Sequence, residues 1–339
     1  METSKHQAPP DALEGAPVIL DTDIGGDADD ALAVAASARL LPDLAAVVTG
    51  DEVAGQRARF ARHLLDLLDR TDVVTVAGAD LGNVCYFVVD GLVPDDVPAQ
   101  RADVVDAVRE VCARTDGPVR WVGMGPLTNL ARVVREAPGL AARLQVAQMG
   151  GALRYRYPDR AEHNVHLDVS AAAEVFAAAA DGRLAMPSFV ASEVTWDPRM
   201  AVTRDSPIYR GLAADAAPAW ARLLVQSLDR WFERFHPATL QHDALTLTAA
   251  LDQPFVIFDV LPIRLDDLGR TTVDETNGVP TRWSLHATYE PFMKWLATAL
   301  DPTSNCPSAI ASRPALTSPR AGSRSASLAR HRSGRAGSV

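Results

Sequence analysis

Five aspartates fall within ten residues near the start of the chain, at positions 21, 23, 27, 29 and 30. They follow an apolar run that ends in Asp21, so they occupy a turn between a strand and the next helix. Carboxylates packed this densely repel one another, and a strand end is only partly solvated. Because no Lys or Arg lies nearby in the sequence, we expect a divalent cation to compensate the charge. Oxygen ligands alone favour Ca²⁺ or Mg²⁺ over zinc.

Two features of this turn bear on that expectation. Gly25 and Gly26 allow the backbone to turn tightly around an ion. As an alternative, Asp29 or Asp30 caps the following helix, because carboxylates favour the N-terminal end of a helix. A cap accounts for one or two of the five aspartates and leaves the others unexplained. The sequence therefore predicts a metal site in this turn.

Residues suited to a sugar substrate gather between 149 and 168, where Met149 and a glycine turn precede Glu162, Asn164 and Asp168. These side chains offer the donors and acceptors that buried hydroxyl groups need. Taken alone, they would form a solvated polar loop.

Two shorter segments carry further candidates. Thr128 and Asn129 follow a Gly-Pro turn at a strand-to-helix junction, where either residue is also an ordinary helix cap. His242 and Asp243 open an apolar run. In isolation, Asp243 is as well explained as a cap and His242 as a surface residue.

The elements that must position these residues alternate along the chain as short apolar runs and longer amphipathic stretches. This alternation predicts an α/β fold with a mainly parallel central sheet flanked by helices. Strands are expected at residues 17–21, 45–49, 73–77, 119–122, 145–149 and 189–191. Helices are expected at 30–40, 56–68, 102–114, 127–136, 169–180, 218–235, 243–251 and 289–300, with a hairpin-containing region at 255–284. Functional residues of such sheets collect at the carboxyl ends of the strands, where the polar segments fall.

Composition suggests one catalytic domain at residues 16–301, preceded by a flexible extension at 1–15 and followed by a disordered Ser/Arg-rich tail at 302–339. The tail holds six arginines and no Asp or Glu. Since the whole chain carries −10 and the tail +6, residues 1–301 carry −16. A body this acidic argues against a nucleic-acid partner.

Other partners and locations are limited by the same sequence. Without a run of about 18 apolar residues or an apolar secretory signal, we expect no membrane association and a cytoplasmic location. The cysteines at 85, 112 and 306 have no paired spacing, so neither a disulfide framework nor a zinc site is indicated.

Four segments, in order, resemble the family of inosine-uridine nucleoside hydrolases. They are VILDTDIGGDADDALAV after the first strand, VGMGPLTNLA at 122–131, the Met-Gly-Gly and Ala-Glu-x-Asn motifs within 149–168, and the His-Asp pair at 242–243. The first is two residues longer than the common form, so Asp29 and Asp30, rather than Asp27, match the paired aspartates of the family. The resemblance spans residues 17–300 and implies hydrolysis of the N-glycosidic bond of a ribonucleoside or related riboside.

The resemblance also implies roles for individual residues. Calcium would be held by the side chains of Asp23, Asp30 and Asp243 and by the backbone carbonyl of Thr128. The substrate would contact Asp29, Asp51, Met149, Glu162 and Asn164. Asp23 would be the general base and His242 the proton donor to the leaving base, while Asp21 would support the metal ligands. Related enzymes are commonly homodimers or homotetramers.

Three departures from the family pattern lie on the substrate side. Asp51 stands where the family usually has asparagine, and residues 84–93 lack a His-Gly pair found near the pocket. Arg156 or a neighbour replaces an asparagine, which would suit a negatively charged or otherwise modified sugar.

Two alternatives to a calcium-dependent hydrolase remain. A diverged, non-catalytic riboside-binding protein would keep the metal site and lose the productive substrate geometry. A Mg²⁺-dependent phosphatase would use Asp21 as nucleophile and need a lysine nearby, but the lysines of the chain are Lys5 and Lys294.

Overall fold

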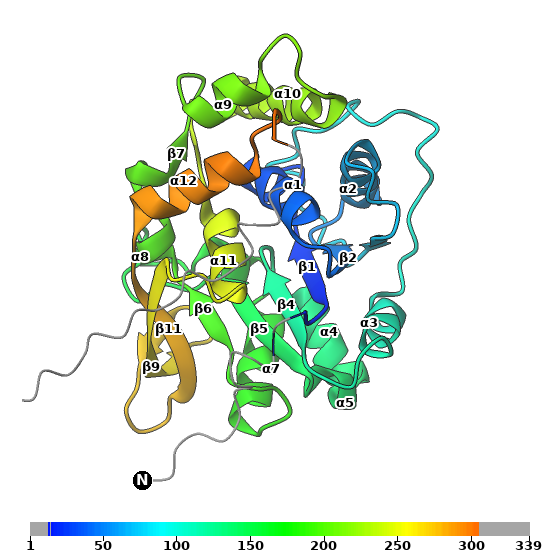
Figure 1. The fold of residues 1–339 in the computed structure, drawn as a ribbon. Coiled ribbons are helices and arrows are strands. Elements are labelled where there is room, and N and C mark those ends of the chain that lie inside the picture. Colours follow the sequence, from blue (N-terminus) through cyan, green and yellow to red (C-terminus); the bar gives the residue numbers. More distant parts are fainter. Residues whose placement is uncertain (1–12, 14, 305–339) are drawn as a thin grey trace, which may run out of the picture.

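A nine-stranded sheet runs through the computed structural model, which describes residue 13 and residues 15–304 (Figure 1). The strand order is β10-β9-β11-β6-β5-β4-β1-β2-β3. Its strands are β1 (Val18–Thr22), β2 (Leu44–Thr49), β3 (Val74–Ala77), β4 (Val119–Gly123), β5 (Leu144–Met149), β6 (Ser188–Val190), β9 (Val256–Leu265), β10 (Thr271–Val273) and β11 (Val279–Ala287). Neighbouring strands are parallel except in the β9–β11 and β9–β10 pairs. The predicted α/β class with a mainly parallel sheet is confirmed.

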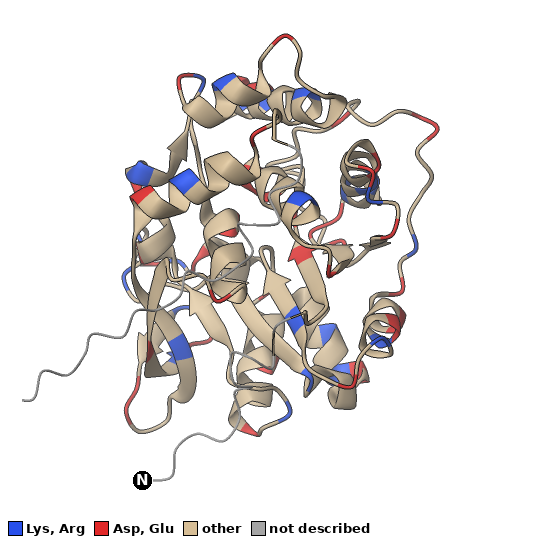
Figure 2. Cartoon of the chain, viewed as in Figure 1, with Lys and Arg blue, Asp and Glu red and all other residues tan. Residues whose placement is uncertain are grey.

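Both faces of this sheet are covered, so the inner strands are apolar along their whole length. All five residues of β1 are buried, and alternate ones face opposite layers. Val18 and Leu20 pack into the core on one face, while Ile19 packs into the core on the other. The strands are mostly uncharged, and the charged residues gather on the helices and loops around them (Figure 2).

Two layers of helices sandwich the sheet (Figure 1). One core contains residues of α1 (Asp29–Leu40), α2 (Gln56–Leu67), α10 (Ala219–Arg234), α11 (His242–Ala250) and α12 (Tyr289–Ala299). The other contains residues of α3 (Val104–Cys112), α4 (Thr128–Glu136), α5 (Pro138–Ala141) and α7 (Val169–Ala180). Shorter elements complete the fold: α6 (His163–Leu167), α8 (Ser192–Thr195), α9 (Pro207–Leu212), a 3₁₀ turn at Pro198–Met200, and the β7 (Ala201–Val202) and β8 (Thr239–Leu240) pair.

The region at 255–284, predicted to contain a hairpin, also adds strands to the central sheet. β9 and β11 pair in antiparallel fashion, as expected, but β11 also pairs in parallel with β6. The C-terminal strands therefore extend the central sheet at one edge. This pairing joins segments about 90 residues apart, which local periodicity does not encode.

The sheet has a switch point beside β1. The chain builds β2 and β3 on one side of β1 and then returns to place β4 on its other side. Asp21, near the end of β1, is in register with Val48 on β2 and with Gly123 on β4. Open α/β sheets bind ligands in the crevice at such a point, outside the carboxyl ends of the strands.

The predicted terminal segments lie mostly outside the described residues. Leu13, within the predicted extension, is buried, and its carbonyl accepts a hydrogen bond from Arg120 Nη2 at 3.0 Å. At the other end, Arg39 Nη2 donates to the Ser304 carbonyl at 3.1 Å. Contacts with the body thus extend beyond residues 16–301 at both ends. Within the described part of the chain, no helix is both long and apolar enough to cross a membrane.

Candidate active site

The turn between β1 and α1 lies at the switch point and carries the aspartate cluster. Asp21 Oδ1 accepts a hydrogen bond from Asn129 Nδ2 at 2.8 Å. Burial raises the pKa of Asp21 to about 8, although the Asn129 bond opposes the rise. Gly25 adopts φ 101°, a conformation that favours glycine. At Gly26, a Cβ atom would lie 2.9 Å from the Tyr86 carbonyl, so this position also needs glycine.

Three buried carboxylates meet beside this turn. Asp29 and Asp30 open α1, Asp243 lies in the first turn of α11, and one oxygen of each lies within 4.8 Å of the others. Asp29 Oδ2 also accepts a hydrogen bond from the Asp243 amide at 3.4 Å. Burial, reinforced by mutual repulsion, raises the pKa of each of these carboxyl groups well above its ordinary value. The structure thus brings together Asp30 and Asp243, expected to bind metal, with Asp29, expected to bind ribose.

Asp23 borders the same group and is more accessible than its three members. Its negative charge contributes to the raised pKa of Asp29, Asp30 and Asp243. A Cβ atom on Gly125 would lie 3.2 Å from Asp23 Oδ1, so the loop after β4 packs directly against this carboxylate.

The group fits a hard divalent cation, since every side chain in it offers oxygen. These carboxylates would repel one another without a cation; burial is the main cause of their raised pKa values, and that repulsion adds to it.

A buried arginine lies against the turn in space, although no Lys or Arg lies nearby in the sequence. Arg57, on α2, is 1% exposed. Its Nη1 donates to the carbonyls of Asp23 and Ile24, its Nε donates to the Asp51 carbonyl at 2.7 Å, and its Nη2 lies 3.4 Å from Asp51 Oδ2. One guanidinium therefore ties the turn after β1 to the turn after β2. Arg57 forms no ion pair with Asp29, Asp30 or Asp243, and no other described side chain supplies these three carboxylates with a paired cation.

Asp51 adopts φ 47°, an uncommon conformation for a residue with a side chain. Its Oδ2 accepts a hydrogen bond from Asn83 Nδ2 at 2.9 Å and faces Arg57. Its Oδ1 is buried with no hydrogen-bond partner among the described residues. A buried acceptor without a partner is costly, so Oδ1 is available to a donor on a ligand.

Thr128 is not placed as expected for a metal ligand. It is the first residue of α4, and its hydroxyl donates to Asp168 Oδ2 at 2.8 Å. Helical carbonyls point toward the C-terminal end of their helix, so that of Thr128 points away from the strand ends. Met124 directly follows β4, and its carbonyl accepts a hydrogen bond from Asn164 Nδ2 at 3.0 Å. The backbone at 124–125, which also packs on Asp23, is thus nearer to the carboxylates.

The expected sugar-binding residues come together after β5. Asn164 Nδ2 lies 3.2 Å from the Met149 carbonyl and 3.3 Å from its sulfur. Glu162 caps α6, where its Oε2 accepts from the amides of Gly151 and Asn164. Burial raises the pKa of Glu162, while His163 and these amide bonds oppose the rise.

His242 lies at the start of α11, next to Asp243. Its ring stacks against Trp196 with centroids 5.9 Å apart, and its Nδ1 is buried without a partner among the described residues. Burial, with the positive charges of Arg156 and His163, lowers the pKa of His242 to about 3. The imidazole is therefore neutral near pH 7 and offers an N–H as a hydrogen-bond donor.

Comparison with known proteins places this arrangement in a family. The family model described as inosine-uridine preferring nucleoside hydrolase matches residues 18–303. The chain belongs to this family. It is therefore an N-glycosyl hydrolase of a metal-dependent family whose reaction converts ribonucleosides to ribose and free base.

Individual relatives agree with the family. The chain is 28% identical over 286 residues to a pyrimidine-specific ribonucleoside hydrolase RihA from Enterobacter sp. (strain 638), covering 78% of this chain and 84% of that one. The solved purine-preferring ribonucleoside hydrolase from Gardnerella vaginalis superimposes with a TM-score of 0.68 at 20% identity, over 87% of this chain and 99% of that one. The type III effector protein XopQ, solved in complex with adenosine diphosphate ribose, gives a TM-score of 0.64 at 20% identity, covering 89% and 97% of the two chains. These two structures show the shared fold.

Sequence reasoning missed Arg57 and Trp196 in this nucleoside hydrolase. Arg57 lies on the buried stripe of α2 with Phe60, Ala61 and Leu64. An arginine on an otherwise apolar helix face was the available signal for Arg57. Trp196 directly follows α8, the short helix after β6, and a tryptophan this close to the end of a parallel strand was its signal.

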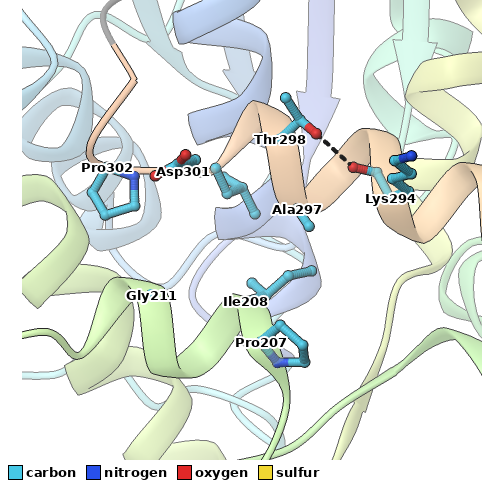
Figure 3. Close-up of a pocket in the computed structure, with 9 residues that line it drawn as sticks. Pro207, Ile208, Gly211, Lys294, Ala297, Thr298, Asp301 and Pro302 are labelled. Carbon is cyan, nitrogen blue, oxygen red and sulfur yellow. Dashed lines mark hydrogen bonds between the residues drawn. The ribbon is translucent and has the colours of Figure 1, made fainter.

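A separate hollow of about 300 Å³ lies between α9 and α12 and is lined mainly by apolar residues (Figure 3). Lys294 and Asp301 are the charged residues in its lining. It contains none of the expected site residues, so the carboxylate group at the switch point remains the candidate active site.

Proposed function

We propose that this nucleoside hydrolase cleaves the N-glycosidic bond of a ribonucleoside or related riboside in a calcium-dependent reaction. The observation that carries the proposal is the group formed by Asp29, Asp30 and Asp243, three buried carboxylates within 4.8 Å at the switch point of the sheet. Its all-oxygen donor set suits Ca²⁺, which accepts several carboxylates and backbone carbonyls in flexible geometry.

In this proposal, Asp23, Asp30 and Asp243 hold the cation. The backbone carbonyl that completes the set is that of Met124, in place of Thr128, because of where α4 begins. Asp21 supports the ligands through its bond to Asn129.

The cation, when bound, supplies positive charge that orients the attacking water and lowers its pKa. Asp23, the most accessible carboxylate of the group, accepts a proton from that water. Asp29 and Asn164 receive ribose hydroxyls, and Met149 lies under the sugar. Glu162 lies toward the 5′ end of the ribose, and Asp51 Oδ1 accepts from a substrate donor.

His242 assists departure of the base. Because its ring is neutral near pH 7, it acts by donating an N–H hydrogen bond to the base as negative charge develops there. An unperturbed histidine, with a pKa of about 6.5, would still be protonated in part near pH 7 and could also donate as imidazolium.

The test is release of reducing sugar from a panel of ribonucleosides and modified ribosides, with added Ca²⁺ and with a chelator. We expect release of ribose from at least one member with Ca²⁺ and none with the chelator. Restoration by Mg²⁺ and not by Ca²⁺ would contradict the choice of metal. Absence of release from every riboside, with the ion bound, would contradict the reaction.

A riboside-binding protein without turnover is the second candidate, and Asp51 favours it. Arg57 and Asn83 hold this carboxylate at the place where the family usually has an amide. The related fold of XopQ has been solved with adenosine diphosphate ribose bound. Ligand-dependent thermal stabilisation without product would support binding alone. The phosphatase alternative lacks its lysine among the described residues, because Lys294 lies on α12 beside the separate hollow.

For the assembly, we propose a homodimer or homotetramer acting on a small molecule, with neither nucleic acid nor membrane as partner. The net charge of −10 supports the exclusion of nucleic acid. Light scattering after size-exclusion chromatography measures the assembly directly, and a monomer would contradict it. Cytoplasmic residence stays a prediction.

A further inference from the structure

The loop between β5 and α6 brings an exposed arginine to the candidate active site. Arg156 lies in this loop with its guanidinium carbon 3.9 Å from the centroid of the Trp196 ring. Trp196 in turn stacks on His242, which precedes the buried Asp243. The arginine, tryptophan and histidine therefore form a column that ends beside the carboxylate group.

Aromatic rings hold this guanidinium in place. In addition to the Trp196 ring, the ring centroids of Tyr155 and Tyr157 lie 4.6 and 5.3 Å from the guanidinium carbon. A ring that lies over a guanidinium accepts no conventional hydrogen bond from it, so the N–H donors stay available to other acceptors. The rings thus fix the position of the charge without consuming its hydrogen bonds.

No carboxylate pairs with this charge within the part of the chain that the structure describes. Its one polar contact there is a long one, from Nη1 to Ser192 Oγ at 3.5 Å. Arg199, by contrast, is paired with Asp197, with Nη2 and Oδ2 2.7 Å apart. Arg156 is thus a positioned cation whose donors face solvent at the rim of the site.

We propose that Arg156 binds an anionic group of the substrate, so that the preferred riboside carries a phosphate or a carboxylate. A guanidinium binds either oxyanion through two parallel N–H bonds, which suits the in-plane donors left free here. The anion lies on the 5′ carbon of the ribose or on the leaving base. This inference rests on the proposed riboside hydrolysis and names its substrate class.

The experiment compares wild type, Arg156→Gln and Arg154→Gln in Ca²⁺, with kcat/KM measured for three substrates. Uridine is the neutral reference, uridine 5′-monophosphate carries the anion on the sugar, and orotidine carries a carboxylate on the base. Arg154, exposed and two residues earlier, is the matched control because its loss removes the same charge from the same loop. Thermal unfolding of each variant checks that it is folded.

We expect wild type to prefer one of the anionic substrates over uridine by about 10-fold or more. Arg156→Gln should lower the ratio of anionic to neutral kcat/KM by about 10- to 100-fold, the range for a hydrogen bond to a charged group. Arg154→Gln should leave that ratio within about twofold, and the preference should shrink at high salt. The favoured substrate identifies whether the anion belongs to the sugar or to the base.

A second measurement separates this inference from the proposed reaction. Calorimetric binding of ribose 5-phosphate against ribose, and of orotate against uracil, needs no turnover. Tighter binding of one anion, lost in Arg156→Gln, supports the subsite even if no riboside is cleaved. The inference is overturned if wild type shows no anion preference in either assay. It is also overturned if Arg156→Gln weakens neutral and anionic ligands equally, as a structural role for the stacked arginine would.

Discussion

Asp23 differs from the other carboxylates of the active site because it is partly accessible, whereas Asp29, Asp30 and Asp243 are at most 4% exposed. A general base must reach the water it activates, so accessibility distinguishes this aspartate. We expect Asp23→Asn to lower kcat by about 10²- to 10⁴-fold, the usual contribution of a general base, with thermal unfolding little changed. The exposed Asp267→Asn is the matched control for reducing-sugar release. Near-normal turnover in Asp23→Asn would remove this residue from the role.

His242 is tested by varying the leaving group. A 4-nitrophenyl riboside expels a stable anion and needs little help, whereas a nucleoside expels a poor leaving group. We therefore expect His242→Ala to lower kcat/KM for nucleosides at least about tenfold more than for the nitrophenyl riboside. An equal loss on both substrates would indicate that His242 positions the sugar or Trp196 instead.

At the scale of elements, Arg57 connects α2 to the turns after β1 and β2. Removing one member of a buried ion pair leaves the other charge uncompensated, at a cost of about 3–5 kcal/mol. We expect Arg57→Met to lower the free energy of unfolding by roughly that amount in urea titrations. Adding Asp51→Asn should recover part of the loss, because the buried carboxylate is then gone.

A matched control for the Arg57→Met and Asp51→Asn measurements lies on the same helix. Arg59 donates to the carbonyls of Val97 and Pro94, each at 2.8 Å, and has no carboxylate partner among the described residues. Arg59→Met should therefore cost less, about 1 kcal/mol per lost bond. Strictly additive effects of Arg57→Met and Asp51→Asn would show that the pair is not coupled.

Local patterns predicted most of the elements because apolar periodicity is a local property. The strands β1 to β6 and helices such as α1, α2 and α12 begin and end within about two residues of the expected positions. The same reasoning failed for Arg57, which lies 34 residues from Asp23 and reaches it only through the packing of α2. Absence of a cation in nearby sequence is therefore a poor guide to absence in space.

The candidate site, too, could be predicted from the sequence only in part. Asp30 and Asp243 are more than 200 residues apart, yet the family resemblance placed them together and the structure agrees. The choice of carbonyl in the proposed ligand set depends on where α4 begins, which sequence locates only to within a residue or two. The Arg156–Trp196–His242 column comes from three separate segments, so no local pattern revealed it.

At the scale of the whole molecule, the buried carboxylate group makes stability depend on pH, and through the proposed ion on metal. Burial raises the pKa of Asp21 to about 8 and that of Asp27 to about 7, and the pKa values of Asp29, Asp30 and Asp243 lie well above normal. Unfolded aspartates release their protons near pH 3.9, about the ordinary value. Between about pH 4 and pH 8 these five carboxyl groups therefore hold more protons in the metal-free native state than in the unfolded state. Their contribution to the free energy of unfolding falls as pH rises through this range.

Under the proposed function, calcium would reverse this trend, because an ion held by the charged carboxylates displaces their protons. Stabilisation by the ion follows its affinity for the native state, which rises as the carboxylates lose their protons. We expect the increase in Tm caused by millimolar Ca²⁺, measured against the chelator-treated protein, to be larger at about pH 8 than at about pH 6. Asp243→Asn should abolish most of the increase at both pH values, whereas Asp267→Asn should preserve it. An increase of equal size at both pH values would mean that the ion binds away from the buried carboxylates, since only their titration makes its affinity depend on pH in this range.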